Sequence, residues 1–80
     1  MKARVTVTLR PGILDSQGKA VAEALSHMGE GINEVRVGKF IEVDVAENDP
    51  TAARAAVEKM CQSLLANPVT EDYRIELVTG

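Results

Sequence analysis

Cysteine, aromatic residues and long apolar runs are all scarce in this chain of 80 residues. A single cysteine, Cys61, excludes a disulfide within the chain and suits a reducing compartment. No run approaches the roughly 18 apolar residues of a membrane-spanning helix, and no apolar signal segment follows the first residues. We therefore expect a cytoplasmic protein that does not associate with a membrane.

A basic surface is also missing. The net charge is −3, the basic residues are scattered, and Phe40 and Tyr73 are the only aromatic residues. Nucleic-acid binding typically needs a basic stripe with aromatic side chains for stacking, so we expect no nucleic acid among the partners. A chain this short buries only about two-thirds of its unfolded surface. We therefore expect it to pair with itself or to dock onto a larger partner.

Alternation of apolar and polar residues predicts four half-buried strands. They cover residues 4–10, 34–37, 40–45 and 73–78. Only Gly38 and Lys39 separate the second strand from the third, which favours an antiparallel hairpin with its turn at these two residues.

A helical period predicts one helix in each of the two longer intervals between strands. The first has Asp15 or Ser16 as N-cap, Gly29 as a left-handed C-cap, and an apolar stripe made of Val21, Ala24, Leu25 and Met28. The second begins at Asp49-Pro50 and ends at Asn67-Pro68. Its apolar stripe consists of Ala53, Ala56, Val57, Met60, Cys61 and Leu64.

The resulting order, β-α-β-β-α-β, predicts a single α+β domain over residues 1–80. Two helices on one face of a four-stranded antiparallel sheet, the ferredoxin-like arrangement, would bury every apolar stripe. The opposite face would be polar, either solvated or crossed by ion pairs. It would carry Arg4, Thr6, Thr8, Arg36, Glu42, Asp44, Arg74 and Glu76.

Residues for catalysis are lacking. His27 is the only histidine, expected near a helix end, and Cys61 lies on an apolar stripe, where burial makes a thiol inert. Glu42 and Asp44 could approach a cation, but cross-strand ion pairs are the commoner outcome. Neither Gly-Lys pair fits a phosphate-binding loop, although Lys39 could still offer a charge to a phosphate or carboxylate. We expect no catalytic residue, metal or cofactor in this chain.

Four segments together resemble the PurS family. Residues 11–21 are similar to its P-G-V-L-D-P-Q-G-x-A-V opening, and residues 35–42 to its V-R-x-G-K-x-I-E hairpin. Residues 60–69 resemble its M-C-x-x-L-L-A-N-P-V helix exit, and residues 71–76 its E-x-Y-x-I-E strand. The one departure is Ser16, where proline is common.

The resemblance implies an accessory subunit of phosphoribosylformylglycinamidine synthase, without catalytic residues of its own. Its partners would be a glutaminase subunit and a large synthetase subunit, the latter holding ATP and magnesium, and the chain would form a homo-oligomer. The segments of highest resemblance also fall where loops are expected, so their residues become candidate partner contacts. These are Asp15, Gln17, Arg36, Gly38, Lys39, Asn67 and Pro68.

Two alternatives stay open. In the first, the residues of each of these loops only form a turn and contact no partner. A regulatory module similar to ACT domains, which bind an amino acid at a dimer interface, shares the order of elements and an R-x-P-G-x-L type of turn. Residues 10–14 and 31–33 fit that pattern loosely.

Overall fold

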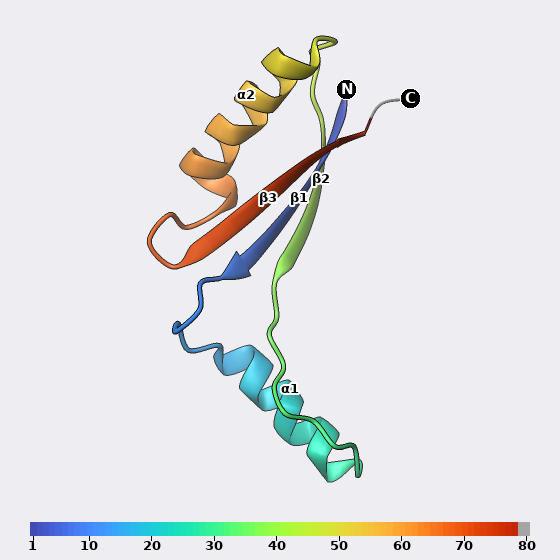
Figure 1. Cartoon of the computed structure of the whole chain (residues 1–80), viewed down its shortest axis with the longest axis vertical. Helices are drawn as coiled ribbons and strands as arrows, with labels where there is room; N and C mark the ends of the chain where they lie inside the picture. The colour runs from blue at the N-terminus through green and yellow to red at the C-terminus, as the bar shows by residue number, and fades with distance from the viewer. Residues whose placement is uncertain (79–80) are drawn as a thin grey trace.

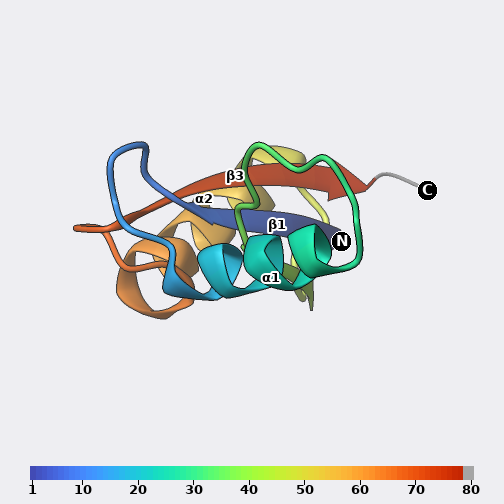
Figure 2. The same ribbon diagram turned by 90° about the horizontal axis from the view of Figure 1, so that it is seen from below.

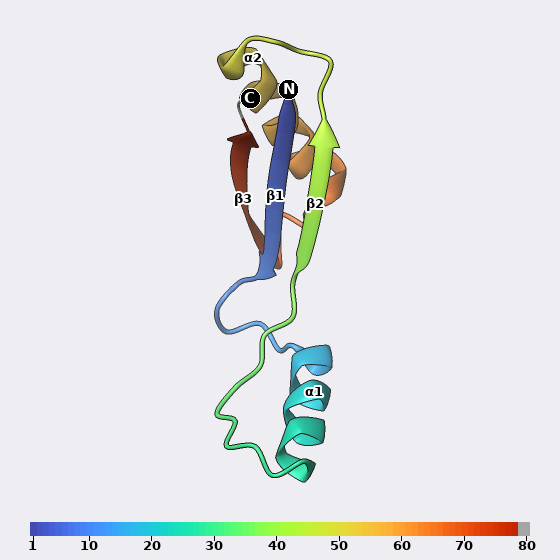
Figure 3. The ribbon, with the colours of Figure 1, turned by 90° about the vertical axis from the view of Figure 1, so that its right-hand side faces the viewer.

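A computed structural model describes residues 1–78 and contains one three-stranded antiparallel sheet. The strands β1 (Lys2–Leu9), β2 (Lys39–Asp44) and β3 (Glu71–Val78) lie in the order β2-β1-β3 (Figure 3). Val5 on the central strand is opposite Ile41 on one side and Ile75 on the other. This register places the apolar residues of all three strands, apart from Phe40 and Val78, on one face, as the alternation predicted.

Helix α2 (Pro50–Met60) covers that apolar face (Figure 1). As predicted, Asp49 is the N-cap, its carboxylate accepting a hydrogen bond from the Ala52 amide at 3.1 Å, and Pro50 opens the helix. The buried residues of the core are all small: Ala3, Val5, Val7, Ala53, Val57, Cys61 and Ala66.

A π-helical turn, η1 (Cys61–Leu65), continues α2 and corrects one detail of the predicted stripe. The Ala66 amide donates to the Cys61 carbonyl, a bond that spans five residues instead of four. The wider turn places Leu65 against the core, whereas Leu64 is 83% exposed. The prediction of Leu64 as a core residue was therefore wrong, and Met60, at 36% exposed, lies at the rim.

Helix α1 (Ser16–His27) lies beyond the end of the sheet and does not cover it (Figures 1 and 3). Its ends are as predicted: Asp15 is the N-cap, and Gly29 adopts a φ of +87°. After Gly29 the chain lies beside α1 (Figure 2) and returns toward the sheet (Figure 3). We call the sheet with α2 and η1 the head, residues 16–34 the arm, and the two connections between them, residues 10–15 and 35–38, the neck.

The predictions of four strands and of two helices on one face are not met within residues 1–78. Residues 34–37 form no strand, and the chain does not reverse at Gly38-Lys39 but runs on from the neck into β2. Gly38 lacks the positive φ that the favoured two-residue hairpin turns require. Arg36 therefore lies in the neck and not on the polar face of the sheet. Thr79 and Gly80, the end of the predicted single domain, lie outside the described residues.

The open shape leaves apolar surface uncovered. Val21 and Met28, on the predicted inner stripe of α1, are 38% and 73% exposed. The radius of gyration is 15.9 Å, against about 12 Å for a compact domain of this length. Arm and head therefore do not share one core.

Candidate interaction site

Arg36 crosses the neck and binds the opposite chain segment. Its guanidinium donates to the carbonyl oxygens of Ile13 at 3.0 Å and of Arg10 at 3.2 Å, and a longer contact of 3.5 Å reaches Leu9. A planar group with several donors can hold two carbonyls at once, which an ammonium group does less well. Arg36 thus ties the two connections of the neck together.

Asp15 ties the same two connections from the other side. It is only 7% exposed, and its carboxylate accepts hydrogen bonds from the Val37 amide at 2.6 Å and from the Gly18 amide at 2.7 Å. These two bonds hold the pKa of the Asp15 carboxyl below its ordinary value of 3.8, against the opposing effect of desolvation. The positive charge of Arg36 acts in the same direction.

Two glycines let the neck segment 35–38 lie close to its neighbours, α1 on one side and β1 on the other. A side chain at Gly18 would overlap the Val35 carbonyl, and one at Gly38 would overlap the Val7 carbonyl. Gly18 is also the one buried residue of α1. At both positions the chain needs hydrogen in place of Cβ, because another backbone lies against it.

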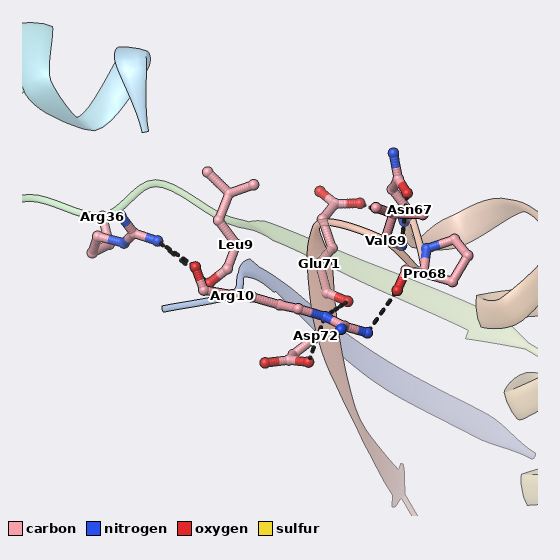
Figure 4. A network of polar contacts seen from close by, with 8 residues as sticks. All are labelled: Leu9, Arg10, Arg36, Asn67, Pro68, Val69, Glu71 and Asp72. Atoms are coloured by element: carbon pink, nitrogen blue, oxygen red, sulfur yellow. Dashed lines mark hydrogen bonds and ion pairs between the residues drawn. The ribbon is translucent and has the colours of Figure 1, made fainter. Parts of the chain in front are cut away.

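A second cluster lies at the loop between η1 and β3 (Figure 4). Arg10 donates to the Pro68 carbonyl at 2.6 Å and forms an ion pair with Asp72 at 3.3 Å. The side chain of Asn67 accepts from the Val69 amide at 2.9 Å, and the Asn67 amide donates to the Glu71 carboxylate at 2.6 Å. These contacts hold the loop together. The side chain of Val69 is 75% exposed, so the loop also presents an apolar group to solvent.

The remaining sequence-predicted residues connect or flank these clusters. Lys39, at the start of β2, lies 3.9 Å from Glu71 and 3.4 Å from the Leu65 carbonyl, so it joins the loop cluster. Gly38 belongs to the neck. Gln17 is exposed in the first turn of α1. The structure therefore brings Asp15, Arg36 and Gly38 together in the neck, and Lys39, Asn67 and Pro68 together at the loop.

The polar face of the sheet has cross-strand ion pairs, one of the two states predicted for it, and the cations include Arg4 and the amino terminus. Arg4 on the central strand lies 3.6 Å from Glu42 on one side and 3.6 Å from Glu76 on the other. Asp44 lies 3.6 Å from the amino group of Met1. Phe40, 61% exposed, also lies on this face, beside an open hollow of about 880 Å³. Glu42 and Asp44 are thus occupied by cations of the protein.

The two reactive residue types lie far apart in the fold. His27 is the last residue of α1, at the end of the arm, as predicted. Cys61 is fully buried in the head, and burial raises the pKa of its thiol, with Glu58 acting in the same direction. Residues 1–78 contain no group of three metal-ligating side chains, and none of their helices is long and apolar enough to cross a bilayer.

Three side chains of the loop cluster, Arg10, Glu71 and Asp72, are not among the contact residues predicted from the sequence. The sequence favours a strand exit and turn at Arg10, with a ligand loop as the second interpretation, and neither predicts its bond to the Pro68 loop. Glu71 belonged to a segment of high resemblance and was read only as the start of a strand. Each binds a residue some 30 to 60 positions away in sequence, which local patterns cannot reveal.

Comparisons with known proteins agree over almost the whole chain. A family model described as "PurS: Phosphoribosylformylglycinamidine (FGAM) synthase" matches residues 2–79. A phosphoribosylformylglycinamidine synthase subunit PurS from Synechocystis is 43% identical over 75 residues, 92% of this chain and 75% of that protein.

Solved structures share the open shape. Bacillus subtilis PurS, 42% identical, superposes with a TM-score of 0.84 and covers 94% of both chains. A chain in the structure of PurLQS from Thermotoga maritima, 30% identical, gives 0.86 and covers 94% of this chain and 93% of that one. The comparisons do not support the alternative of an ACT-like regulatory module. This chain, with its three-stranded α+β head and outlying helix, belongs to the PurS family, subunits of phosphoribosylformylglycinamidine synthase in purine biosynthesis.

Proposed function

We propose that this chain is the non-catalytic bridging subunit that holds a glutaminase subunit and a large synthetase subunit together in the cytoplasm. The observation that carries the proposal is the likeness to a chain of the Thermotoga maritima PurLQS structure over nearly its full length. The separation of His27 from Cys61 agrees with a subunit that supplies no nucleophile and base of its own.

The reaction explains why a bridge is needed. The complex would convert formylglycinamide ribonucleotide, glutamine, ATP and water to formylglycinamidine ribonucleotide, glutamate, ADP and phosphate. Ammonia released from glutamine is mostly protonated in neutral water, so an enclosed path keeps it nucleophilic and concentrated at the acceptor. ATP and magnesium would be bound by the synthetase, with no cofactor in this chain.

The loop cluster offers the better surface for a larger subunit. Lys39, Asn67 and Pro68 are exposed there, and the apolar side chains of Leu64 and Val69 are 83% and 75% exposed nearby in sequence. Gln17 is also exposed, but it lies in the first turn of α1 and outside this cluster. Arg10 and Glu71 hold the loop in one shape, which lowers the entropy lost on binding. By contrast, the hydrogen bonds of Asp15 and Arg36 and the close contact of Gly38 are made within the chain. We therefore propose that these three residues shape the neck and do not contact a partner directly.

The open shape supports pairing with a second copy of this chain. Val21 and Met28 leave an apolar stripe of α1 exposed. On the other side, Ile41 and Val43 on β2, and Val45 just after it, are only half-buried. The first surface is the apolar stripe of a helix, and the second is one half of the apolar face of the sheet. The ferredoxin-like arrangement packs these two kinds of surface together. In a dimer, α1 of each copy would cover the β2 side of its partner's sheet.

The strand order supports the same pairing. In the expected four-stranded sheet, residues 34–37 would lie beside β2. In the structure β2 is an edge strand, and no other strand of residues 1–78 pairs with its outer backbone groups. Unpaired edges favour pairing with another chain. Residues 34–37 of a second copy would supply the fourth strand, so that the single domain predicted for residues 1–80 would be completed between two chains.

Reconstitution tests the bridging role. The purified chain alone should show neither glutaminase nor ligase activity. A mixture of glutaminase and synthetase should use glutamine only when this chain is added, while the synthetase with free ammonium salt should work without it. Full glutamine-dependent turnover in the absence of this chain would contradict the proposal.

A further inference from the structure

The neck keeps α1 away from the sheet, which we call the open form. The local sequence favours a different, closed form, in which the chain reverses at Gly38-Lys39. Residues 34–37 and β2 alternate as two strands of a hairpin should, and Gly38-Lys39 between them suits a two-residue turn. A chain closed at that turn would bring residues 34–37 alongside β2 and α1 onto the β2 side of its own sheet. The open form instead keeps residues 35–38 extended.

The contacts that distinguish the open form are concentrated in three residues. Arg36 donates to the Ile13 and Arg10 carbonyls, and Asp15 accepts from the Val37 amide. Gly18 allows Val35 to lie against the start of α1. A hairpin turn at Gly38-Lys39 would rotate residues 35–37 away from residues 10–15, so all of these bonds would have to break.

We infer that Asp15, Gly18 and Arg36 form a lock that prevents the chain from closing its own hairpin and so reserves α1 and residues 34–37 for a second copy. Exchange of an identical element between two copies is a low-cost route to a dimer, and the hinge decides whether it occurs. The role of the lock rests on the proposed self-pairing. Its contacts do not, because they all lie within one chain.

Arg36 is the best place to test the lock because its side chain is exposed and does not contribute to the apolar core. Replacing it removes hydrogen bonds from a charged group, each of which commonly changes an equilibrium about tenfold or more. Arg36→Ala should therefore give a folded protein with a growing fraction of monomer on dilution. Its dimer dissociation constant should rise by about tenfold or more relative to the wild type.

Two measurements read the result. Light scattering after size exclusion, over a dilution series, distinguishes the 8.6 kDa of one chain from twice that mass. X-ray scattering distinguishes a closed monomer, with a radius of gyration of about 12 Å, from an open one near 15.9 Å. Arg74→Ala, which removes an arginine from the polar face of the sheet, is the matched control and should behave as the wild type.

Arg36→Lys keeps the charge and most of the stem, so it tests the lock even if Arg36→Ala does not fold. A single ammonium should hold the neck less well than the guanidinium and give an intermediate dissociation constant. If the folded variants have the dissociation constant and monomer size of the wild type, there is no lock at Arg36. A wild type that stays monomeric with a radius near 15.9 Å would refute the self-pairing and leave the lock intact. A wild-type monomer of about 12 Å would refute both.

Discussion

Head and arm differ in where their apolar residues find partners. In the head, Val5, Val7 and Val57 are fully buried between the sheet and α2. In the arm, α1 has an equally regular stripe, yet Val21 and Met28 face solvent. Both helices have proper caps and similar periodicity, so the difference does not arise from local sequence. It shows that an amphipathic stripe predicts the need for a partner surface but not which chain provides it.

The neck explains how two such different parts are joined without a flexible linker. Asp15 and Arg36 bind backbone groups of the facing segment, and Gly18 lets that segment approach. Hydrogen bonds from side chains to backbone groups fix the direction of the two connections without the need to bury much surface. The arm is therefore held at a defined position although it shares no core with the head.

The largest expected effect comes from placing the same charge in each region. Val57→Asp buries an unpaired carboxylate in the head and should lower the free energy of unfolding by about 3 kcal/mol or more. Val21→Asp on α1 should change it by less than about 1 kcal/mol in dilute solution, since the site is already exposed. Denaturant titration of both variants checks the contrast.

Val21→Asp should nevertheless weaken self-association, which a dilution series by light scattering would detect. Equal destabilisation by the two substitutions would mean that the arm is packed against a core within one chain, contrary to the comparison. Val21→Ala serves as the control for loss of the side chain without added charge.

A smaller effect should follow from Arg10→Ala, which frees the loop between η1 and β3 from the head. The side chain is 47% exposed, so solvent screens its ion pair with Asp72, and the short bond to the Pro68 carbonyl dominates. We expect a loss of about 1 kcal/mol in stability and weaker binding to the larger subunits. Thermal melts and co-purification measure the two effects, with Arg74→Ala as control. A melt lowered with unchanged binding would limit the loop to a structural role.

Acid should weaken the neck. Because the pKa of Asp15 is lowered on folding, its contribution is complete well above the ordinary value of 3.8 and is lost as pH falls through the lower folded value. The stability difference between the wild type and Asp15→Asn should therefore be constant near neutral pH and shrink below pH 3.8. Denaturant titrations of both proteins across this range measure it. A difference that persists unchanged into strong acid would show that the Asp15 carboxylate charge contributes nothing.

The smallest effect is expected for Lys39→Ala. Its contacts are long, 3.9 Å to Glu71 and 3.4 Å to the Leu65 carbonyl, and the side chain is 55% exposed. Stability should change by no more than about 0.5 kcal/mol. If co-purification with the larger subunits also stays normal, Lys39 is only a solvated charge beside the loop. A clear loss of binding with a normal melt would make it a partner contact.

Sequence patterns predicted the local structure well and the long-range arrangement less well. Both N-caps, the left-handed Gly29 and the three strands of the sheet were found where capping and alternation placed them. Leu64 was misplaced because a π-helical turn breaks the period by one residue, and nothing in the sequence marks that turn. The candidate site was found in part: Asn67, Pro68 and Lys39 do cluster, but Arg10 and Glu71, which hold the loop, were missed.

By itself the sequence determined the two α-helices, the three strands of the sheet, most of their apolar faces and the family, because caps, periods and motifs act over a few residues. Only the tertiary structure decided whether Gly38-Lys39 turns back or runs straight, since both conformations satisfy the local pattern. The choice depends on bonds between residues some 20 positions apart, Arg36 to Ile13 and Val37 to Asp15, and on the close approach at Gly18. Those few contacts place α1 away from its own sheet.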